Sequence, residues 1–274
     1  MIVKVLGIGR PNRGAELMLA AIEESVAEMW PGAIVVTSTS SDIFVKVMFY
    51  LRRRIKLPLL PYKLCDIPSL LPKALRSLLD IRADADVNVF LDSSGFAYGD
   101  QWGVDKLRQR ITYTLPHIKR SGRTFIVLPQ ALGPFTNNGF KSDLAILIAH
   151  ADVVFARDQI SLHYLEEIIG VQDNVVLSPD FTNLIVPKSE MIQAPGDLAI
   201  IPNSKMMEMK AVSDEANYIT ALLDAVTSAR TLGYQPFLLN HEGIKDLRLI
   251  KKINDRLITY CRYLTVQTLC KLNR

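Results

Sequence analysis

Cysteine is scarce in this chain of 274 residues, and its few cysteines form no pattern. Cys65, Cys261 and Cys270 are odd in number and share no spacing that is typical of a metal site. A disulfide framework would need paired cysteines, and a cysteine-bound metal would need clustered ones. The sequence therefore predicts reduced thiols in a cytosolic protein, and it predicts no metal site.

Long apolar runs and a strong excess of one charge are also lacking. No run approaches the roughly 18 apolar residues that a membrane-spanning helix needs. The apolar start at Met1 is short and has neither a basic region nor a cleavage site, so it is expected to be a first strand and not a signal peptide. The net charge of +4 is too small to indicate nucleic-acid binding, but it suits anionic small molecules or an anionic membrane surface.

Short apolar runs alternate along the chain with helical patterns. Ile2–Ile8 is expected to be a buried strand, and Leu19, Ile22, Val26 and Met29 then repeat at the spacing of an amphipathic helix. Continuous apolar strands separated by such helices indicate a parallel sheet covered on both faces, which is a Rossmann-like α/β domain. The other strands are expected at 33–36, 87–91, 124–128, 153–156 and 175–177, and the other helices at about 104–121, 140–149 and 159–169.

A polar stretch punctuated by proline divides the sequence. We expect an N-terminal domain at 1–186, a linker at 187–196 and a second Rossmann-like domain at 197–274. The second part is expected to have strands at 198–201 and 236–239 and helices at about 214–231 and 245–257. Two strand–helix units are too few for a complete doubly wound domain, so the chain is expected to be truncated.

Ligands of open parallel sheets bind beyond the carboxyl ends of the strands, and those positions carry the candidate residues. The first loop leads into Asn12, Arg13, Gly14 and Glu16, where the start of a helix offers unpaired N–H groups to an anion. Asn12 replaces the third glycine of a dinucleotide fingerprint, and no acidic residue follows the second strand to hold a ribose, so NAD is disfavoured. The loop can also be a simple strand-to-helix turn.

Later strand ends supply further candidates. Ser93, Ser94 and Gly95 suit contacts to an anion or a hydroxyl, but no nucleophile elbow surrounds the serines. Gln130 precedes a turn rich in proline and glycine that is expected to aim it at a ligand. Arg157 can grip a carboxylate or phosphate, or it can pair internally with the neighbouring Asp158 or with Asp180, and Asp158 can cap the following helix.

The remaining candidates are Asp180, which follows the last strand of the first domain, and three residues at strand ends of the second. These are Asn203, Lys205 and His241, and His241 is the one histidine placed like a site residue. A separate stretch, Phe44–Leu79, mixes aromatic residues with a basic run at 52–56. It suggests peripheral contact with a membrane or a lipid-linked substrate, or else a solvated crossover helix.

Taken together, these loops resemble the polysaccharide pyruvyl transferase family. The order and spacing match through about the first 250 residues. The matching motifs are Asn12-Arg-Gly-Ala-Glu16, Asp92-Ser-Ser-Gly-Phe96, Pro129-Gln-Ala-Leu-Gly-Pro134, Ala156-Arg-Asp158 with Ser161 and Leu165, Pro179-Asp-Phe181, and His241-Glu-Gly-Ile-Lys-Asp246.

The resemblance implies two Rossmann-like domains facing a cleft, in an arrangement similar to GT-B glycosyltransferases. It implies transfer of a pyruvyl group from phosphoenolpyruvate to a sugar or lipid-linked oligosaccharide of a cell-surface polysaccharide precursor, at the inner face of the membrane and without a cofactor. His241 and Asp180 become the expected catalytic residues, and the other candidates become substrate contacts.

The sequence departs from the family at three points. Arg10 and Pro11 stand in a first loop that members usually make rich in glycine and aspartate or asparagine, and Ser93 and Ser94 stand where members often have glycine. More seriously, nothing after His241 supplies the close arginine and histidine that members carry. Losing acid–base and charge stabilisation would weaken transition-state binding, so the chain alone is expected to be inactive. The alternatives are a GT-B glycosyltransferase that uses a nucleotide sugar and a non-catalytic binding remnant.

Overall fold

The computed structural model of the chain describes residues 1–8, 13–37, 72, 74–75, 83–185, 194–208, 211–212, 214–241 and 243–265. The chain divides into two compact units, Met1–Val186 and Pro187–Arg274. Each unit has its own parallel sheet and its own hydrophobic core. Most of the expected linker and nearly all of the stretch 44–79 lie outside the described residues.

The first unit is built on a six-stranded sheet in the order β2-β1-β3-β4-β5-β6, and every pair in it is parallel. The predicted parallel α/β fold is confirmed. The chain first moves outward from β1 to β2 and then returns to the other side of β1, so the strand order reverses between β1 and β3. The strands are β1 (Ile2–Leu6), β2 (Ile34–Thr37), β3 (Val89–Asp92), β4 (Thr124–Gln130), β5 (Val153–Ala156) and β6 (Val175–Leu177).

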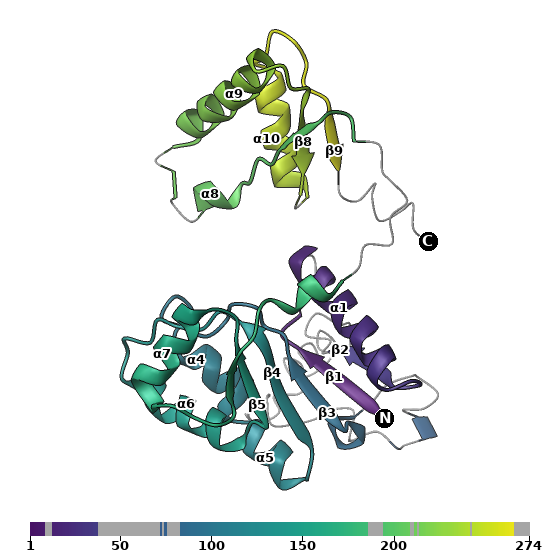
Figure 1. The fold of residues 1–274 in the computed structure, drawn as a ribbon, viewed down its shortest axis with the longest axis vertical. Helices are drawn as coiled ribbons and strands as arrows, with labels where there is room; N and C mark the ends of the chain where they lie inside the picture. The colour runs from purple at the N-terminus through teal and green to yellow at the C-terminus, as the bar shows by residue number, and fades with distance from the viewer. Residues whose placement is uncertain are drawn as a thin grey trace, which may run out of the picture. The chain divides into compact units, whose positions relative to one another are not determined.

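Helices cover both faces of this sheet. Alternate side chains of a strand point to opposite faces, and here they pack into two different cores. Val89 and Leu91 of β3 pack in one core with helix α1, whereas Phe90 between them packs in a second core with Phe125. Figure 1 shows α1 apart from the other helices of the unit. The helices are α1 (Arg13–Met29), α4 (Val104–Leu107), α5 (Leu115–Arg120), α6 (Gly139–His150) and α7 (Gln159–Ile169), with short 3-10 turns η2 (Asp84–Asp86) and η4 (Phe181–Leu184).

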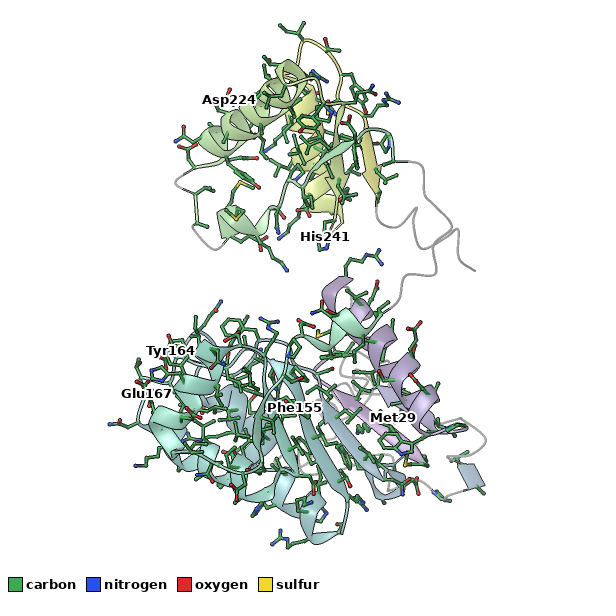
Figure 2. All side chains as sticks on the ribbon, in the orientation of Figure 1. Met29, Phe155, Tyr164, Glu167, Asp224 and His241 are labelled. Carbon is green, nitrogen blue, oxygen red and sulfur yellow. The ribbon has the colours of Figure 1, made fainter. Side chains whose placement is uncertain are left out.

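Two helical expectations for the first unit need correction. The single helix expected at about 104–121 is instead α4, a π-helical turn η3 (Arg108–Thr112) and α5. Pro116 lies in the first turn of α5, where its missing N–H does no harm, but it could not continue an α-helix from before. Met29, expected on the buried stripe of α1, is exposed (Figure 2). The 17-residue helix α1 is about 25 Å long, whereas the five-residue strand β1 is about 17 Å long. The last turn of α1, which contains Met29, therefore extends beyond the strand.

The second unit has a three-stranded parallel sheet in the order β7-β8-β9. Its core joins apolar residues of the sheet and two helices with Cys261, a buried free thiol as expected. Strand β9 and helix α8 were not expected from the sequence. The elements are β7 (Leu198–Ile200), α8 (Lys205–Glu208), α9 (Glu215–Thr231), β8 (Pro236–Asn240), α10 (Ile244–Asn254) and β9 (Tyr263–Thr265).

Candidate functional site

The carboxyl ends of five neighbouring strands in the first unit are joined by a chain of hydrogen bonds. Parallel strands end at one edge, so the loops that follow them lie side by side. Ser93, Ser94, Gly95, Gln130, Arg157 and Asp180 thereby lie at one edge of the sheet. The links, taken from β1 to β6, are Ser93 N to Leu6 O (3.0 Å), Gln130 Nε2 to Asp92 Oδ2 (3.3 Å), Arg157 N to Gln130 O (3.0 Å) and Ser178 N to Ala156 O (3.0 Å).

The loops after β1 and β3 approach each other most closely, where the strand order reverses. Gly7 has a φ of 85°, and a Cβ there would lie 2.4 Å from the Ser94 hydroxyl and 2.7 Å from the Ser94 backbone. Only glycine fits this contact, in conformation and in space. The Ser93 hydroxyl donates to Leu6 O over 3.0 Å and so ties β3 to β1. Ser93 is buried, whereas Ser94 and Gly95 are partly accessible.

Asp92, the last residue of β3, is the centre of a buried hydrogen-bond network. Its side chain is 1% exposed and accepts from the Ser94 hydroxyl (2.6 Å), the Tyr98 hydroxyl (2.8 Å) and Gln130 Nε2 (3.3 Å). Burial raises the pKa of Asp92, and these hydrogen bonds together with Arg110 offset part of the rise. Gln130 lies beneath the edge of the sheet with its Oε1 buried and unpartnered among the described groups.

Arg110 approaches this network from the π-helical turn η3. Its Nη1 donates to the Ser94 hydroxyl over 2.7 Å, so Ser94 stands between a guanidinium and a buried carboxylate. Lys106 lies on the same stretch, and burial followed by the charge of Arg110 lowers its pKa. Single π-helical turns often occur at functional sites. Arg110 therefore faces Ser94 at the edge of β3, and Lys106 lies nearby over the ring of Trp102.

Arg157 pairs internally with Asp180, which was one of the two expected outcomes. Arg157 Nη1 lies 3.3 Å from Asp180 Oδ2, and both side chains are about one-third exposed. Burial raises the pKa of Asp180, but hydrogen bonds from Thr182 and the charge of Arg157 outweigh it, and the net pKa is lowered. Asp158 accepts from Ser161 N over 2.8 Å and caps α7 as predicted. A half-exposed arginine with one carboxylate partner can exchange that partner for a ligand anion.

The first turn of α1 carries the other candidates of the first unit. Arg13 and Glu16 form an ion pair within that turn, and Gly14 between them is exposed. Asn12 lies outside the described residues. The predicted anion contact at this helix start stays a prediction.

In the second unit the candidates lie in the loops after β7 and β8. Asn203 N donates to the Tyr218 hydroxyl over 3.1 Å, and Asn203 Oδ1 accepts from Lys205 N over 2.9 Å. The buried Asp246 accepts from Ser204 N (2.9 Å) and from the Ser204 hydroxyl (2.7 Å). His241 directly follows β8 and is exposed (Figure 2). The loop after β7 is thus fixed to α9 and α10, and it presents its side chains from a rigid base.

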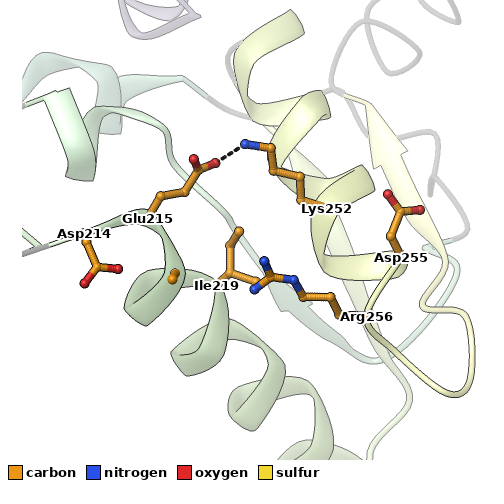
Figure 3. Close-up of a pocket in the computed structure, with 7 residues that line it drawn as sticks. Asp214, Glu215, Ile219, Lys252, Asp255 and Arg256 are labelled. Carbon is orange, nitrogen blue, oxygen red and sulfur yellow. Dashed lines mark hydrogen bonds and ion pairs between the residues drawn. The ribbon is translucent and has the colours of Figure 1, made fainter.

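A surface hollow of the second unit contains none of the predicted residues. It is lined from α9 and α10, and the ion pair of Glu215 with Lys252 crosses it (Figure 3). Its other lining residues are Asp214, Ala216, Ile219, Asp255 and Arg256. Within the described ranges no cluster of histidine, cysteine and acidic side chains suits a metal ion, and no helix has the length and apolarity to cross a membrane.

Sequence reasoning passed over Tyr98, Arg110 and the central role of Asp92. The signal for Asp92 was available, because an acidic residue ending the otherwise apolar strand Val89–Leu91 has to be buried or to face a ligand. No pattern in the sequence identified Arg110, since its contact with Ser94 spans 16 positions.

Comparisons with known proteins give one strong match. A family model described as polysaccharide pyruvyl transferase matches residues 12–273. Among solved structures, Alr3699/HepE of Anabaena with UDP-glucose is 14% identical at a TM-score of 0.45, over 97% of this chain and 69% of that one. The MnaA–UDP structure of S. aureus is 10% identical at a TM-score of 0.49, over 99% and 71%. No curated protein matches the sequence.

Proposed function

The chain belongs to the polysaccharide pyruvyl transferase family, and from that premise we propose that it transfers a pyruvyl group from phosphoenolpyruvate to a sugar of a cell-surface polysaccharide precursor. Family membership carries the proposal. A transferase needs no bound cofactor for this reaction, because phosphoenolpyruvate itself is the activated donor.

The reaction balances with the groups of donor and acceptor alone. A proton adds to the methylene carbon of phosphoenolpyruvate, and one sugar hydroxyl oxygen bonds to the adjacent carbon. A second hydroxyl oxygen then bonds to the same carbon as the phosphate leaves. One hydroxyl proton makes up for the proton used, and the other departs on phosphate. The product is a cyclic ketal that carries a methyl group and a carboxylate.

The protein has to hold two anionic groups of the donor, its carboxylate and its phosphate. Arg157 is proposed for one of these because its partner Asp180 is only half-buried and can give way. Arg13 in the first turn of α1, which is followed by the exposed Gly14, and Asn12, which precedes Arg13 in the sequence, are proposed for the other. Ser94, Gly95, Asn203 and Lys205 are proposed acceptor contacts.

Acid–base roles follow from the charge states. The pKa of Asp180 is lowered, so its carboxylate is ionised at neutral pH and suits a base or a partner of Arg157 more than an acid. His241 is proposed as the group that delivers the proton. Gln130, buried beneath Asp92, is proposed to position the loop and not to bind substrate directly.

The test is a transfer assay on the protein isolated from its source cells, with phosphoenolpyruvate as the donor and a set of sugars or lipid-linked sugars as acceptors. The 274-residue chain alone, which the sequence predicts to be inactive, is assayed beside it. We expect release of phosphate that depends on the acceptor, together with an acid-labile ketal detected by mass spectrometry. Phosphate release without any acceptor product would contradict the proposal. A uridine nucleotide sugar serves as the comparison donor, and glycosyl transfer from it would establish the rival function.

The proposal places the acceptor on a lipid carrier at the inner face of the membrane. Binding of the chain to vesicles with and without anionic lipid tests that part separately. An absence of vesicle binding would leave a soluble acceptor in its place.

A further inference from the structure

An exposed pair of aromatic side chains lies in the loop that follows β3. Phe96 is 39% exposed and Trp102 is 42% exposed, and their ring centroids lie 6.4 Å apart at an interplanar angle of 74°. Burying such rings releases considerable free energy, and neighbouring aromatics such as Phe135 and Phe140 are buried. An exposed aromatic pair beside strand ends is therefore a candidate for contact with a ligand.

The loop that carries this pair is rigidly held. Its backbone runs alongside the loop after β4, and Asp100 accepts from Thr136 N (2.9 Å) and from the Thr136 hydroxyl (2.7 Å). Three backbone hydrogen bonds join the two loops: Ala131 N to Gly95 O, Gly133 N to Tyr98 O and Asp100 N to Pro134 O, each 2.9 Å. The rings are held in place before any ligand arrives, which limits the entropy lost on binding.

Two cations adjoin the aromatic pair. Lys106 Nζ lies 4.4 Å from the centroid of the Trp102 ring, and Arg110 follows four positions later, with Nη1 on the Ser94 hydroxyl. Among the described residues no carboxylate forms an ion pair with either cation. Asp105 on the same stretch faces Arg108, and Asp92 is reached only through Ser94.

The charge of Arg110 acts on the ammonium group of Lys106, whose pKa is lowered. Burial and then the charge of Arg110 lower the pKa, so the two cations repel each other. A bound anion would relieve this repulsion and would gain charge-assisted hydrogen bonds from both side chains. The cations therefore favour an anionic ligand, and the rings favour one with an apolar face.

We propose that the surface formed by Phe96, Trp102, Lys106 and Arg110, the Trp102 surface, binds a sugar phosphate, with the sugar ring against the aromatic side chains and the phosphate on the two cations. One face of a pyranose presents C–H groups, which are attracted to the negative face of an aromatic ring. The inference rests on the proposed function in that a precursor on a lipid carrier reaches the enzyme as a sugar joined to phosphate.

The experiment is a calorimetric titration of the chain with galactose 1-phosphate, galactose and inorganic phosphate. We expect the sugar phosphate to bind more tightly than either part alone. Trp102→Ala should weaken sugar-phosphate binding about tenfold, in line with the stacking free energies known for aromatic side chains, and leave phosphate binding unchanged. Lys106→Gln and Arg110→Gln should weaken binding of both phosphate-bearing ligands.

Two matched controls keep the test specific. Tyr113→Ala removes another exposed aromatic side chain of the same segment, and Arg120→Gln removes a cation at the end of α5. Neither should change the titrations. Trp102→Phe keeps an aromatic ring and should retain most of the affinity, which separates loss of contact from misfolding.

The proposal is overturned if Trp102→Ala binds the sugar phosphate as the unchanged chain does, or if inorganic phosphate binds equally tightly. Its failure can be told apart from failure of the transferase function. Pyruvyl transfer without sugar-phosphate binding would overturn the Trp102 surface alone. Tryptophan-dependent binding without transfer would support the surface and remove the proposed reaction.

Discussion

Asp92 and Asp180 both stand at the carboxyl edge of one parallel sheet, yet their surroundings move their pKa values in opposite directions. Asp92 is almost fully buried, and the loss of hydration raises its pKa despite its three side-chain donors. Asp180 is one-third exposed, and Thr182 and Arg157 lower its pKa in spite of partial burial. The depth of the carboxylate decides which effect is larger.

The comparison indicates that the two aspartates at this sheet edge have different roles, one in stability and one in ligand binding. The donors to Asp92 are neutral side chains, two of which, Tyr98 and Gln130, are buried, so Asp92 organises the loop after β3. The partner of Asp180 is an arginine that solvent also reaches. We therefore expect substitutions at Asp92 to act on stability and substitutions at the Arg157 pair to act on turnover.

The largest effect should follow from Arg157→Ala. Removing a guanidinium that holds a donor anion should lower phosphoenolpyruvate-dependent turnover by about 10²- to 10³-fold. The unfolding free energy should change by less than about 1 kcal/mol, because the pair with Asp180 is half-exposed. Steady-state phosphate release and chemical denaturation measure the two quantities. Unchanged kinetics would remove Arg157 from the site.

Asp92→Ala should act in the opposite way, chiefly on stability. The substitution removes the carboxylate that accepts from the buried hydroxyl of Tyr98 and from the amide of Gln130, and Tyr98 keeps only the longer 3.4 Å contact with the Ser94 hydroxyl. The loss should be about 3 kcal/mol. Asp105→Ala, at an exposed carboxylate of the same unit, is the control and should cost less than about 0.5 kcal/mol. Urea denaturation gives both values. Equal losses for the two variants would contradict the structural role of Asp92.

Much of this edge could be predicted from the sequence, and the reason is periodicity. The β5 and β6 strands and the α7 helix begin and end where the sequence placed them, because apolar runs and helical repeats are local signals. The strand-end positions of Ser94, Arg157 and Asp180 followed from the same local signals. The Asp158 cap followed from the preference of aspartate for helix starts.

What the sequence did not predict depends on contacts between distant positions. The network around Asp92 needs Arg110 and Gln130, which reach it from a π-helical turn and from another strand. The aromatic contact of Phe96 with Trp102 depends on how one loop folds back on itself. No repeating pattern in the sequence signals either arrangement, because both depend on packing between different elements.

A smaller effect on the same network is expected from Tyr98→Phe. This change deletes only the hydroxyl that donates to Asp92 Oδ2 over 2.8 Å, and the ring stays in its buried place. The loss should be about 1 kcal/mol, because Gln130 and Ser94 still donate to the carboxylate. Thermal denaturation of Tyr98→Phe beside Tyr113→Phe, an exposed tyrosine, gives the comparison. A loss as large as that of Asp92→Ala would show that the hydroxyl and not the carboxylate organises the loop.

The smallest effect, and the one that sharpens the contrast most, is the pH dependence of stability. The pKa of Asp92 is raised, so the folded chain binds more protons than the unfolded chain between about pH 4 and the folded pKa. Its contribution is present below about pH 4 and falls as the pH rises through that window. The pKa of Asp180 is lowered, so its contribution is present above about pH 4 and falls as the pH drops through the folded pKa.

Asn variants isolate the two titrations, because each removes one carboxylate. The stability difference between the unchanged chain and Asp92→Asn should shrink as the pH rises above about 4. The difference for Asp180→Asn should shrink as the pH falls below about 4. Urea denaturation across that range measures both curves. If both slopes had the same sign, the two aspartates would share one environment, and the division of the sheet edge into a stabilising and a ligand-exchanging carboxylate would fail.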